Sequence, residues 1–179
     1  ASYGPIGAGI PGKKLDKVIG IMKAYSSCVG EGPFVAELFG EEAEKLREAG
    51  AEYGAATGRP RRVGGFDLVA SAYGVKMQGA DELALTKLDV LSYLDKIPVC
   101  VAYEIDGVRT TVFPSTEKQL RAKPVYEYLE GFHTDISKCR KAEDLPKTAL
   151  DYIRFIENAV GCPIKYVSVG PKREDYLVL

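Results

Sequence analysis

Hydrophobic residues spaced three or four apart predict amphipathic helices in the first third of the chain. A helix over about 13–25 is indicated by Leu15, Val18, Ile19 and Met22. A second helix is expected over 36–49, where apolar positions alternate with charged ones and Gly50 follows as a stop signal. The first twelve residues include six glycines or prolines, which is typical of a loop.

Shorter patterns follow in the middle of the chain. Residues 54–65 are glycine-rich and predict an irregular stretch, and Asp67 is placed to cap a helix that continues to about Lys76. A short apolar strand is expected to end near Leu85.

The most distinct pattern is a β-hairpin at about 99–113, where β-branched and aromatic runs flank Asp106-Gly107. Pro146 and Gly161 then bracket an amphipathic helix. The segment CPIKYVSVGP, at 162–171, predicts a buried strand that ends at a Gly-Pro turn. Because helices and strands alternate without a repeat or a dividing linker, we expect one α/β unit with a mixed sheet flanked by helices.

Composition and charge favour a folded domain. Of the 179 residues, 46% are hydrophobic and 27% are charged, which is the usual globular balance. The 24 Lys and Arg against 25 Asp and Glu give a net charge of −1, so general nucleic-acid binding is disfavoured. No run of about 18 apolar residues and no signal-peptide pattern occurs, which predicts a soluble, cytoplasmic protein without a membrane span.

Zinc binding and histidine catalysis are also disfavoured. The single histidine is His133, and a lone loop histidine is more often a surface residue than a catalytic base. Thiols scattered over a chain of this size fit a reducing compartment, and they lack the paired spacing of a zinc site. The four cysteines are Cys28, Cys100, Cys139 and Cys162.

Two phosphate-loop patterns near the start lack the context they need. GAGIPG at 7–12 fits G-x-G-x-x-G, and GAGIPGK at 7–13 fits most of G-x-x-x-x-G-K. A phosphate cradle follows a strand, and the residues before Gly7 make a poor strand. The hydroxyl residue that would bind Mg²⁺ is replaced by Lys14, so we interpret both as chance matches.

The segment AATGRPRRVGG, at 55–65, places Arg59, Arg61 and Arg62 within one glycine-bounded loop. Three guanidinium groups so close together repel one another unless an anion or an acid lies between them. One interpretation is a bound carboxylate or phosphate, for which arginine offers paired donors in a plane. The other is a solvated basic loop, or arginines that pair with acids elsewhere in the chain.

Two strand ends carry a pattern that suits guanine. TKLDV places Lys87 and Asp89 two apart, as in the N-K-x-D motif, where a carboxylate accepts hydrogen bonds from two N–H groups of guanine. The ordinary alternative is an exposed Lys and Asp beside a strand. SVGP, at 168–171, ends the last strand, where open α/β sheets bind ligands, although it equally fits a plain turn.

Several long segments together resemble one family, adenylosuccinate synthetase, in its C-terminal half only. They are KAYSSCVGEGPF (23–34), EYGAATGRPRRVGGFD (52–67), LALTKLDVLSYLDKIPVCVAYE (83–104), KPVYEYLEGF (123–132) and YVSVGPKRED (166–175). The resemblance implies an α/β fold that is part of a large, mainly parallel (mixed) sheet flanked by helices, with a guanine site like that of P-loop GTPases. It implies that residues 1–179 are the C-terminal portion, and that the phosphate loop and catalytic residues belong to an absent N-terminal half.

By the same resemblance, the activity is a ligation in purine biosynthesis. GTP and Mg²⁺ are used to phosphorylate the 6-oxygen of IMP, and the amine of L-aspartate then displaces phosphate to give adenylosuccinate. The Mg²⁺ ligands are expected in the N-terminal half, and the family works as a homodimer.

The resemblance also implies site residues, none of them catalytic. Thr57 and Arg59 are the best matched of the aspartate-binding loop; Arg59 also faces IMP, and Val29 touches its ribose. The aspartate and IMP set is Val29, Ala55, Ala56, Thr57, Gly58, Arg59, Pro60 and Arg61. The GTP set is Arg61, Lys87, Leu88, Asp89, Ser168, Val169, Gly170 and Pro171. Ala56 stands where the family usually has a threonine, so one hydroxyl contact to aspartate is missing.

These expectations lead to a strict geometric requirement. The arginine loop and the Lys87–Asp89 pair must meet at one edge of one cleft. The chain by itself is expected neither to bind GTP tightly nor to turn over. The alternatives are a guanine-nucleotide binding or regulatory module without catalysis, and an α/β interaction domain.

Overall fold

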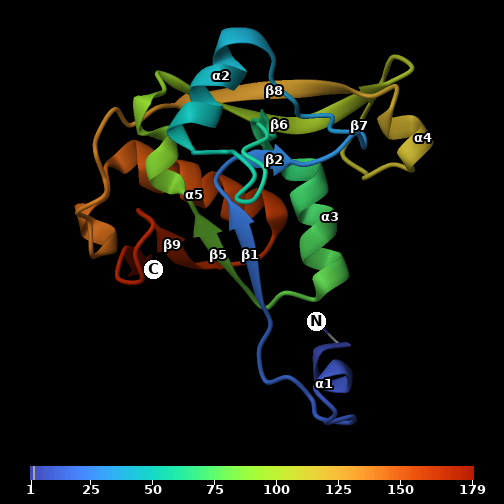
Figure 1. The fold of residues 1–179 in the computed structure, drawn as a ribbon, viewed down its shortest axis with the longest axis vertical. Coiled ribbons are helices and arrows are strands. Elements are labelled where there is room, and N and C mark those ends of the chain that lie inside the picture. The colour runs from blue at the N-terminus through green and yellow to red at the C-terminus, as the bar shows by residue number, and fades with distance from the viewer. Residues whose placement is uncertain (2) are drawn as a thin grey trace.

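A four-stranded sheet forms one half of the fold. The computed structural model describes residues 1 and 3–179. The strands β1 (Ile19–Lys23), β5 (Glu82–Thr86), β9 (Ile164–Ser168) and β10 (Tyr176–Val178) lie in the order β1-β5-β9-β10. The first three are parallel and β10 is antiparallel to β9, so the carboxyl ends of β1, β5 and β9 point the same way (Figure 1).

A second sheet is built around the long strand β6 (Lys96–Ile105). β6 pairs in parallel with β4 (Phe66–Asp67), and antiparallel with β7 (Val108–Thr110) and β8 (Lys123–Glu130). The predicted hairpin is confirmed, because Asp106 and Gly107 have φ values of 52° and 79° in the turn between β6 and β7.

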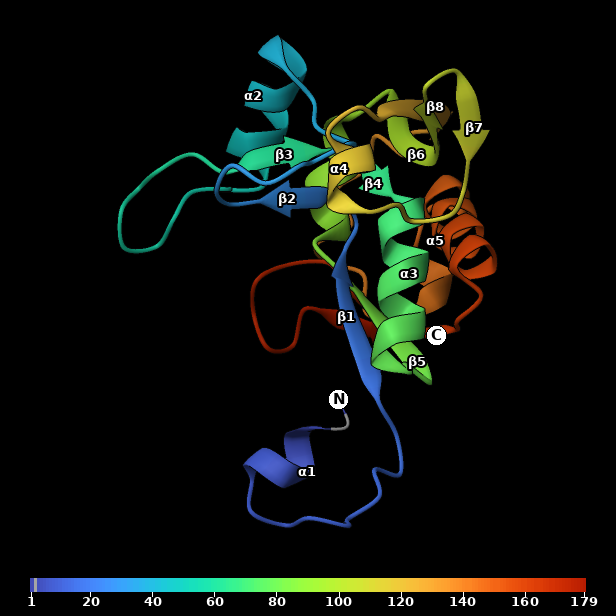
Figure 2. The ribbon, with the colours of Figure 1, turned by 90° about the vertical axis from the view of Figure 1, so that its right-hand side faces the viewer.

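A two-stranded ribbon carries the arginine loop. It pairs β2 (Ser26–Cys28) with β3 (Arg62–Gly64) in antiparallel register. The chain just before β3 projects from the body of the molecule as an extended loop (Figure 2). The predicted irregular stretch at 54–65 is thus wrong at its end, where β3 forms.

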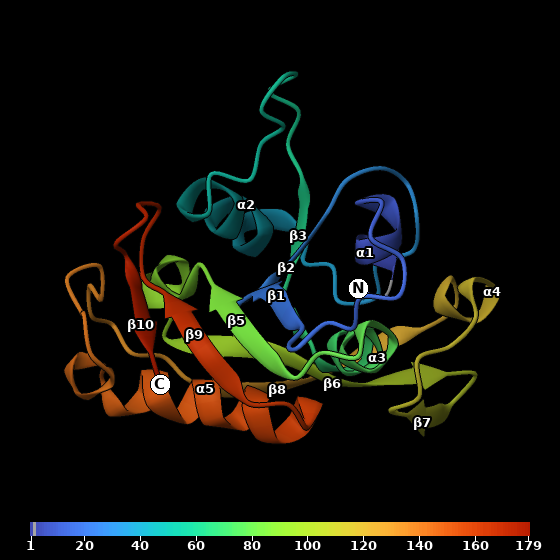
Figure 3. The same cartoon turned by 90° about the horizontal axis from the view of Figure 1, so that it is seen from below.

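Three longer helices support the sheets. α2 is Gly40–Ala49, α3 is Leu68–Gln78 and α5 is Lys147–Val160, and the short elements are α1 (Tyr3–Gly7), α4 (Thr116–Gln119) and the 3₁₀ helices η1 (Leu88–Tyr93) and η2 (Ala142–Asp144). α3 packs against β1, β6 and α5, and α5 also packs against β8. Figure 3 shows α5 running alongside β8, with the strands β9 and β5 above it.

The helix signals read from the sequence are confirmed at three places. The Asp67 carboxylate accepts a hydrogen bond from the Ala70 N–H and caps α3. α5 begins after Pro146 and ends at Gly161, whose φ is 68°. Its apolar face is buried in the core, and the Tyr152 hydroxyl donates a hydrogen bond of 2.5 Å to the carbonyl of Ala24.

The helix predicted over 13–25 is wrong. The chain there is irregular until β1, which pairs with β5 along its whole length. The apolar positions around Ile19-Gly20-Ile21 fit the two-residue period of a strand as well as the period of a helix. Pairing with β5 selects the strand. A Cβ on Gly20 would lie 2.8 Å from Leu83 Cδ2, so glycine allows the two strands to approach.

Three further predictions need correction. The second helix begins at Gly40 and not at 36, because the Leu38 N–H bonds to the Val63 carbonyl in a strand-like segment. The loop expected over the first twelve residues contains α1. The α/β class with mixed sheets is confirmed, but the parallel character belongs to the first sheet, and the second is mainly antiparallel.

Candidate functional site

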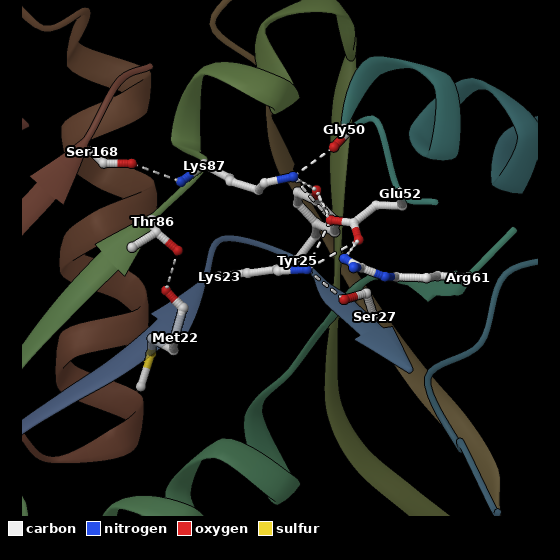
Figure 4. Close-up of polar contacts among 10 residues, drawn as sticks. All are labelled: Met22, Lys23, Tyr25, Ser27, Gly50, Glu52, Arg61, Thr86, Lys87 and Ser168. Atoms are coloured by element: carbon white, nitrogen blue, oxygen red, sulfur yellow. Dashed lines mark hydrogen bonds and ion pairs between the residues drawn. The ribbon is translucent and has the colours of Figure 1, made fainter. Parts of the chain in front are cut away.

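A buried carboxylate joins the predicted site segments. Glu52 is fully buried and accepts hydrogen bonds from Lys23, Tyr25, Arg61 and Lys87 (Figure 4). The Nζ atoms of Lys23 and Lys87 lie 2.8 and 3.1 Å from Oε1, and Arg61 Nη1 lies 2.9 Å from Oε2. Arg61 of the arginine loop and Lys87 of the Lys-x-Asp pair therefore meet at one point.

The local fold explains why these residues meet. Lys23 ends β1, Lys87 follows the neighbouring strand β5, and Glu52 follows the C-terminal end of α2. Lys87 has a φ of 59°, and its Nζ also donates to the carbonyl of Gly50 at 2.5 Å. A Cβ at Gly50 would lie 2.3 Å from the Tyr25 hydroxyl, so only glycine fits there.

The charges around Glu52 keep it ionised. Burial alone would raise the pKa of Glu52, but hydrogen bonds from Lys23, Tyr25, Arg61 and Lys87 outweigh it and lower the pKa to about 2. Burial and the hydrogen bond to Glu52 raise the pKa of Tyr25, so its hydroxyl stays a neutral donor.

Glu52 is expected to make the chain sensitive to acid. Its folded-state pKa of about 2 lies below the ordinary 4.5, so the stabilisation is present above that ordinary value and is lost as the pH falls towards 2. The loss should be about 2–3 kcal/mol of unfolding free energy. Urea unfolding of the chain and of Glu52→Gln between about pH 2 and 6 measures it, because the stability gap between them should shrink with falling pH. A gap that stays constant over this range would contradict the expectation.

The candidate guanine-binding residues lie where β5 and β9 end. The main-chain N–H of Lys87 donates a hydrogen bond of 3.0 Å to Ser168 Oγ, which joins the two predicted segments. Asp89 lies in the first turn of η1 and is half-buried. Burial raises the pKa of Asp89, the Lys87 charge opposes this and Asp175 adds to it. Main-chain N–H groups of Asp89 and Val90 bond to the Asp89 carboxylate, and within residues 1 and 3–179 no side chain donates a hydrogen bond to it.

The loop after β9 is shaped by Asp175, a residue that the sequence analysis did not single out. The Val169 N–H donates to the Asp175 carbonyl at 2.9 Å, and the Lys172 N–H donates to Asp175 Oδ2 at 3.0 Å. Arg140 Nη2 forms an ion pair of 2.9 Å with Asp175 Oδ1. A Cβ on Gly170 would lie 2.5 Å from the same carboxylate, so the loop requires glycine there. Pro171 is exposed beside it.

The arginine loop closes on its own backbone. The Gly54 N–H bonds to the Arg59 carbonyl at 2.9 Å, the Gly58 N–H bonds to the Gly54 carbonyl at 2.8 Å, and Gly58 has a φ of 65°. The Arg59 N–H also donates to Thr57 Oγ1, at 3.4 Å. Residues 55–60 are all exposed, and in the part of the chain that the structure describes the Arg59 guanidinium contacts no acid.

The arginine trio does not depend on one bound anion, because two of its members pair with acids of the chain. Arg61 pairs with Glu52, and Arg62 pairs with Glu37 at 2.5 Å and with the carbonyls of Gly30 and Gly32. The alternative, arginines that reach acids elsewhere in the chain, holds for both. Val29 directly follows β2 and precedes the glycines that Arg62 binds, and it is 73% exposed.

Sequence reasoning missed Lys23, Tyr25 and Glu52 as members of the site. Their only signal was that they lie within segments quoted for the family resemblance. An open hollow of about 310 Å³ lies beside them, lined by Met22, Lys23, Tyr25, Ser26, Ser27, Phe66 and Ser71. A deeper cavity of about 310 Å³ between α2, η1 and β6 contains none of the predicted site residues.

Other candidate chemistry is sparse in the described residues. No group of three or more His, Cys, Asp or Glu side chains there is arranged to hold a metal ion. His133 is about half exposed and lies 3.0 Å from Asp95 at the surface. Among residues 1 and 3–179, no helix combines the length and the apolar composition that crossing a bilayer requires.

Comparison with known proteins gives the family. The family model for adenylosuccinate synthetase matches residues 1–177. The chain is 51% identical over 170 residues to the adenylosuccinate synthetase of Fusobacterium nucleatum and 49% identical over 176 residues to that of Aquifex aeolicus. The chain therefore belongs to the adenylosuccinate synthetase family, which confirms the resemblance noted in the sequence.

The matches also define how much of a relative the chain represents. They cover 94% and 97% of this chain, but 40% and 41% of the two relatives. The structure of fully ligated adenylosuccinate synthetase from Plasmodium falciparum matches 98% of this chain and 42% of that chain, with a TM-score of 0.92 and 39% identity. The chain thus spans about two fifths of the length of these relatives.

Proposed function

We propose that residues 1–179 form the C-terminal portion of an adenylosuccinate synthetase, which works as a cytoplasmic homodimer. In the proposed reaction, GTP with Mg²⁺ drives the joining of IMP and L-aspartate, and this chain supplies the guanine pocket and the aspartate-binding loop. The convergence of Arg61 and Lys87 on Glu52 carries the proposal, because it links the two segments that the reaction needs together.

The proposed chemistry explains why a nucleoside triphosphate is consumed. The 6-oxygen of IMP is a poor leaving group, and transfer of the γ-phosphoryl group of GTP converts it into a good one. The amine of L-aspartate then attacks C6, the carbon that bears this oxygen, and phosphate leaves. The products are adenylosuccinate, GDP and inorganic phosphate.

Guanine recognition is assigned to the ends of β5 and β9. The Asp89 carboxylate accepts hydrogen bonds from N1–H and the exocyclic amine of guanine, a pair that adenine does not offer on one edge. The Lys87 stem lies along the base while its Nζ is held by Gly50 and Glu52. Ser168, Gly170 and Pro171 complete the pocket, and Leu88 and Val169, which are fully buried in the core, support it from within.

The arginine loop is assigned to the other substrates. The exposed Arg59 guanidinium suits the paired oxygens of an aspartate carboxylate, and the Thr57 hydroxyl lies beside its main chain. Arg59 also faces IMP, with Val29 at the ribose. Arg61 bonds to Glu52 through Nη1, and among the described residues its Nε and Nη2 have no partner, which suits contact with a GTP phosphate.

The described residues of this chain contain no cluster of side chains that could bind Mg²⁺. The described residues contain no group of carboxylates, cysteines or histidines arranged for a metal ion, so the Mg²⁺ ligands are assigned to a part outside residues 1–179. No step involving the metal is therefore assigned to this chain.

The proposal is tested by exchanging segments. In a full-length chimera, residues 1–179 replace the matching segment of the Fusobacterium nucleatum relative, and adenylosuccinate formation is measured. We expect activity within about tenfold of the parent relative, since the two segments are alike in sequence. The isolated chain should release no phosphate from GTP with IMP and aspartate present.

The other outcomes separate the alternatives. Phosphate release by the isolated chain that depends on IMP and aspartate would contradict the assignment of catalysis to an absent portion. A folded but inactive chimera that binds GDP more tightly than ADP in calorimetry would instead favour a binding or regulatory module. Equal binding of GDP and ADP would contradict the assignment of a guanine pocket to this chain.

A further inference from the structure

We propose that Glu52 is a positioning residue for the nucleotide: it holds Lys87 and Arg61 in one fixed arrangement without touching any substrate itself. The inference rests on the proposed function, because Lys87 and Arg61 are the residues assigned there to guanine and to a GTP phosphate. Glu52 belongs to neither of the predicted binding sets.

The geometry leaves Glu52 no capacity for a ligand. It is fully buried, so no substrate reaches its carboxylate. Oε1 accepts from Lys23, Tyr25 and Lys87, and Oε2 accepts from Arg61 and, at 3.1 Å, from Lys23. Two carboxylate oxygens offer about four lone-pair directions, and five contacts use all of them. The role of Glu52 must therefore act through the residues that it binds.

The charges make this arrangement depend on one group. Three cationic side chains share a single buried carboxylate, and without it they would repel one another at close range. The side chains of Lys23, Arg61 and Lys87 remain 29%, 31% and 35% exposed. Each of them has a path into solvent and would take it once the central charge is removed.

The backbone allows the side chain to be tested without unfolding the loop. The Glu52 N–H bonds to the Arg47 carbonyl, and the Arg61 N–H bonds to the Glu52 carbonyl, both at 2.9 Å. Neither bond involves the carboxylate. Glu52→Gln keeps the shape of the side chain, removes its charge and turns one acceptor into a donor that faces the cations.

The first test measures whether Glu52 holds Lys87. The isolated chain is treated with an amine-acylating reagent, and the labelling rate of each lysine is followed by mass spectrometry. In Glu52→Gln, the rate at Lys87 should rise about fivefold, since a lysine released from its ion pair with the Glu52 carboxylate reacts faster. Lys45, whose side chain is 61% exposed on α2, serves as the internal standard. An unchanged rate at Lys87 in folded protein would overturn the proposal.

The second test measures whether this holding serves the nucleotide. In the active chimera, Glu52→Gln should raise KM for GTP about tenfold and KM for IMP less than about threefold. A purely structural role predicts a lower melting temperature and less active enzyme with unchanged KM values, and that result would overturn the proposal. The matched control is Glu37→Gln, which breaks the ion pair of the adjacent Arg62 and should leave both KM values within about twofold.

Tyr25→Phe covers the case in which Glu52→Gln does not fold. It removes one donor to Glu52 and the 3.4 Å contact from Lys87 Nζ, and should change the same two quantities in the same direction by about twofold. No change in either quantity would overturn the proposal. An inactive parent chimera would count against the proposed function alone, because the labelling test needs no activity.

Discussion

Replacing Asp89 with asparagine is expected to lower kcat/KM for GTP about 100-fold or more in the chimera that contains residues 1–179. In the proposed guanine pocket, the half-buried carboxylate would accept hydrogen bonds from two N–H groups of guanine, whereas an asparagine would accept only one of them. Its amide N–H then faces a second donor, at a cost of about 3 kcal/mol. Initial rates at varied GTP measure the loss.

Inosine triphosphate gives this prediction its control. It lacks the exocyclic amine, so Asp89→Asn should lower its kcat/KM about tenfold less than that of GTP. Asp95→Asn is the matched variant, because the Asp95 side chain is 95% exposed at the far end of the same segment, and we expect nearly parental kinetics from it. An equal loss with both nucleotides would contradict the assignment of Asp89 to the guanine edge.

Gly64→Ala is expected to destabilise the chain by about 4 kcal/mol and to lower its melting temperature by about 10 °C. A Cβ on Gly64 would lie 1.9 Å from the Ala36 carbonyl oxygen and 2.7 Å from its carbon, both backbone atoms that cannot turn away. Gly64 lies in β3, so the displacement would also move the ribbon that carries Arg61 and Arg62. Calorimetric melting measures the change.

Gly74→Ala is the matched control. Gly74 lies inside α3, and its added Cβ would meet nothing within 4 Å. This change should stabilise the chain by about 0.5–1 kcal/mol, because alanine favours the helix and restricts the unfolded chain. If the Gly64→Ala protein had the same melting temperature as the parent, the strand would have adjusted without strain, and the prediction would be wrong.

Local signals in the sequence predicted those elements whose ends are chemically marked. Asp67 as a cap, Gly161 as a stop and the Asp106-Gly107 turn each depend on one residue and its immediate neighbours, and each is confirmed. β1 was predicted as a helix because its apolar spacing fits both periods, and only pairing with β5, more than 60 residues later, settles the matter. β8 was not predicted for a similar reason: it forms by pairing with β6.

The candidate site divides in the same way. The Lys87–Asp89 pair and the 168–171 segment carry recognisable residue types, and the hydrogen bond between Lys87 and Ser168 brings them together. Glu52 carries no such mark, because one acid among 25 gains its meaning only from the three cations that the fold gathers around it. For the same reason, the sequence left open whether Arg61 pairs with an anion or with an acid of the chain.

The hydrogen bond from Tyr152 to the Ala24 carbonyl links the last long helix to the segment between Lys23 and Tyr25. The two residues are 128 positions apart in the sequence. Tyr152 nevertheless holds the backbone that carries Lys23 and Tyr25, two of the hydrogen-bond partners of Glu52. The position of Lys23 and Tyr25 consequently depends on how α5 packs in the core. Loosening α5 would therefore shift the backbone that carries Lys23 and Tyr25, and with it the proposed nucleotide site.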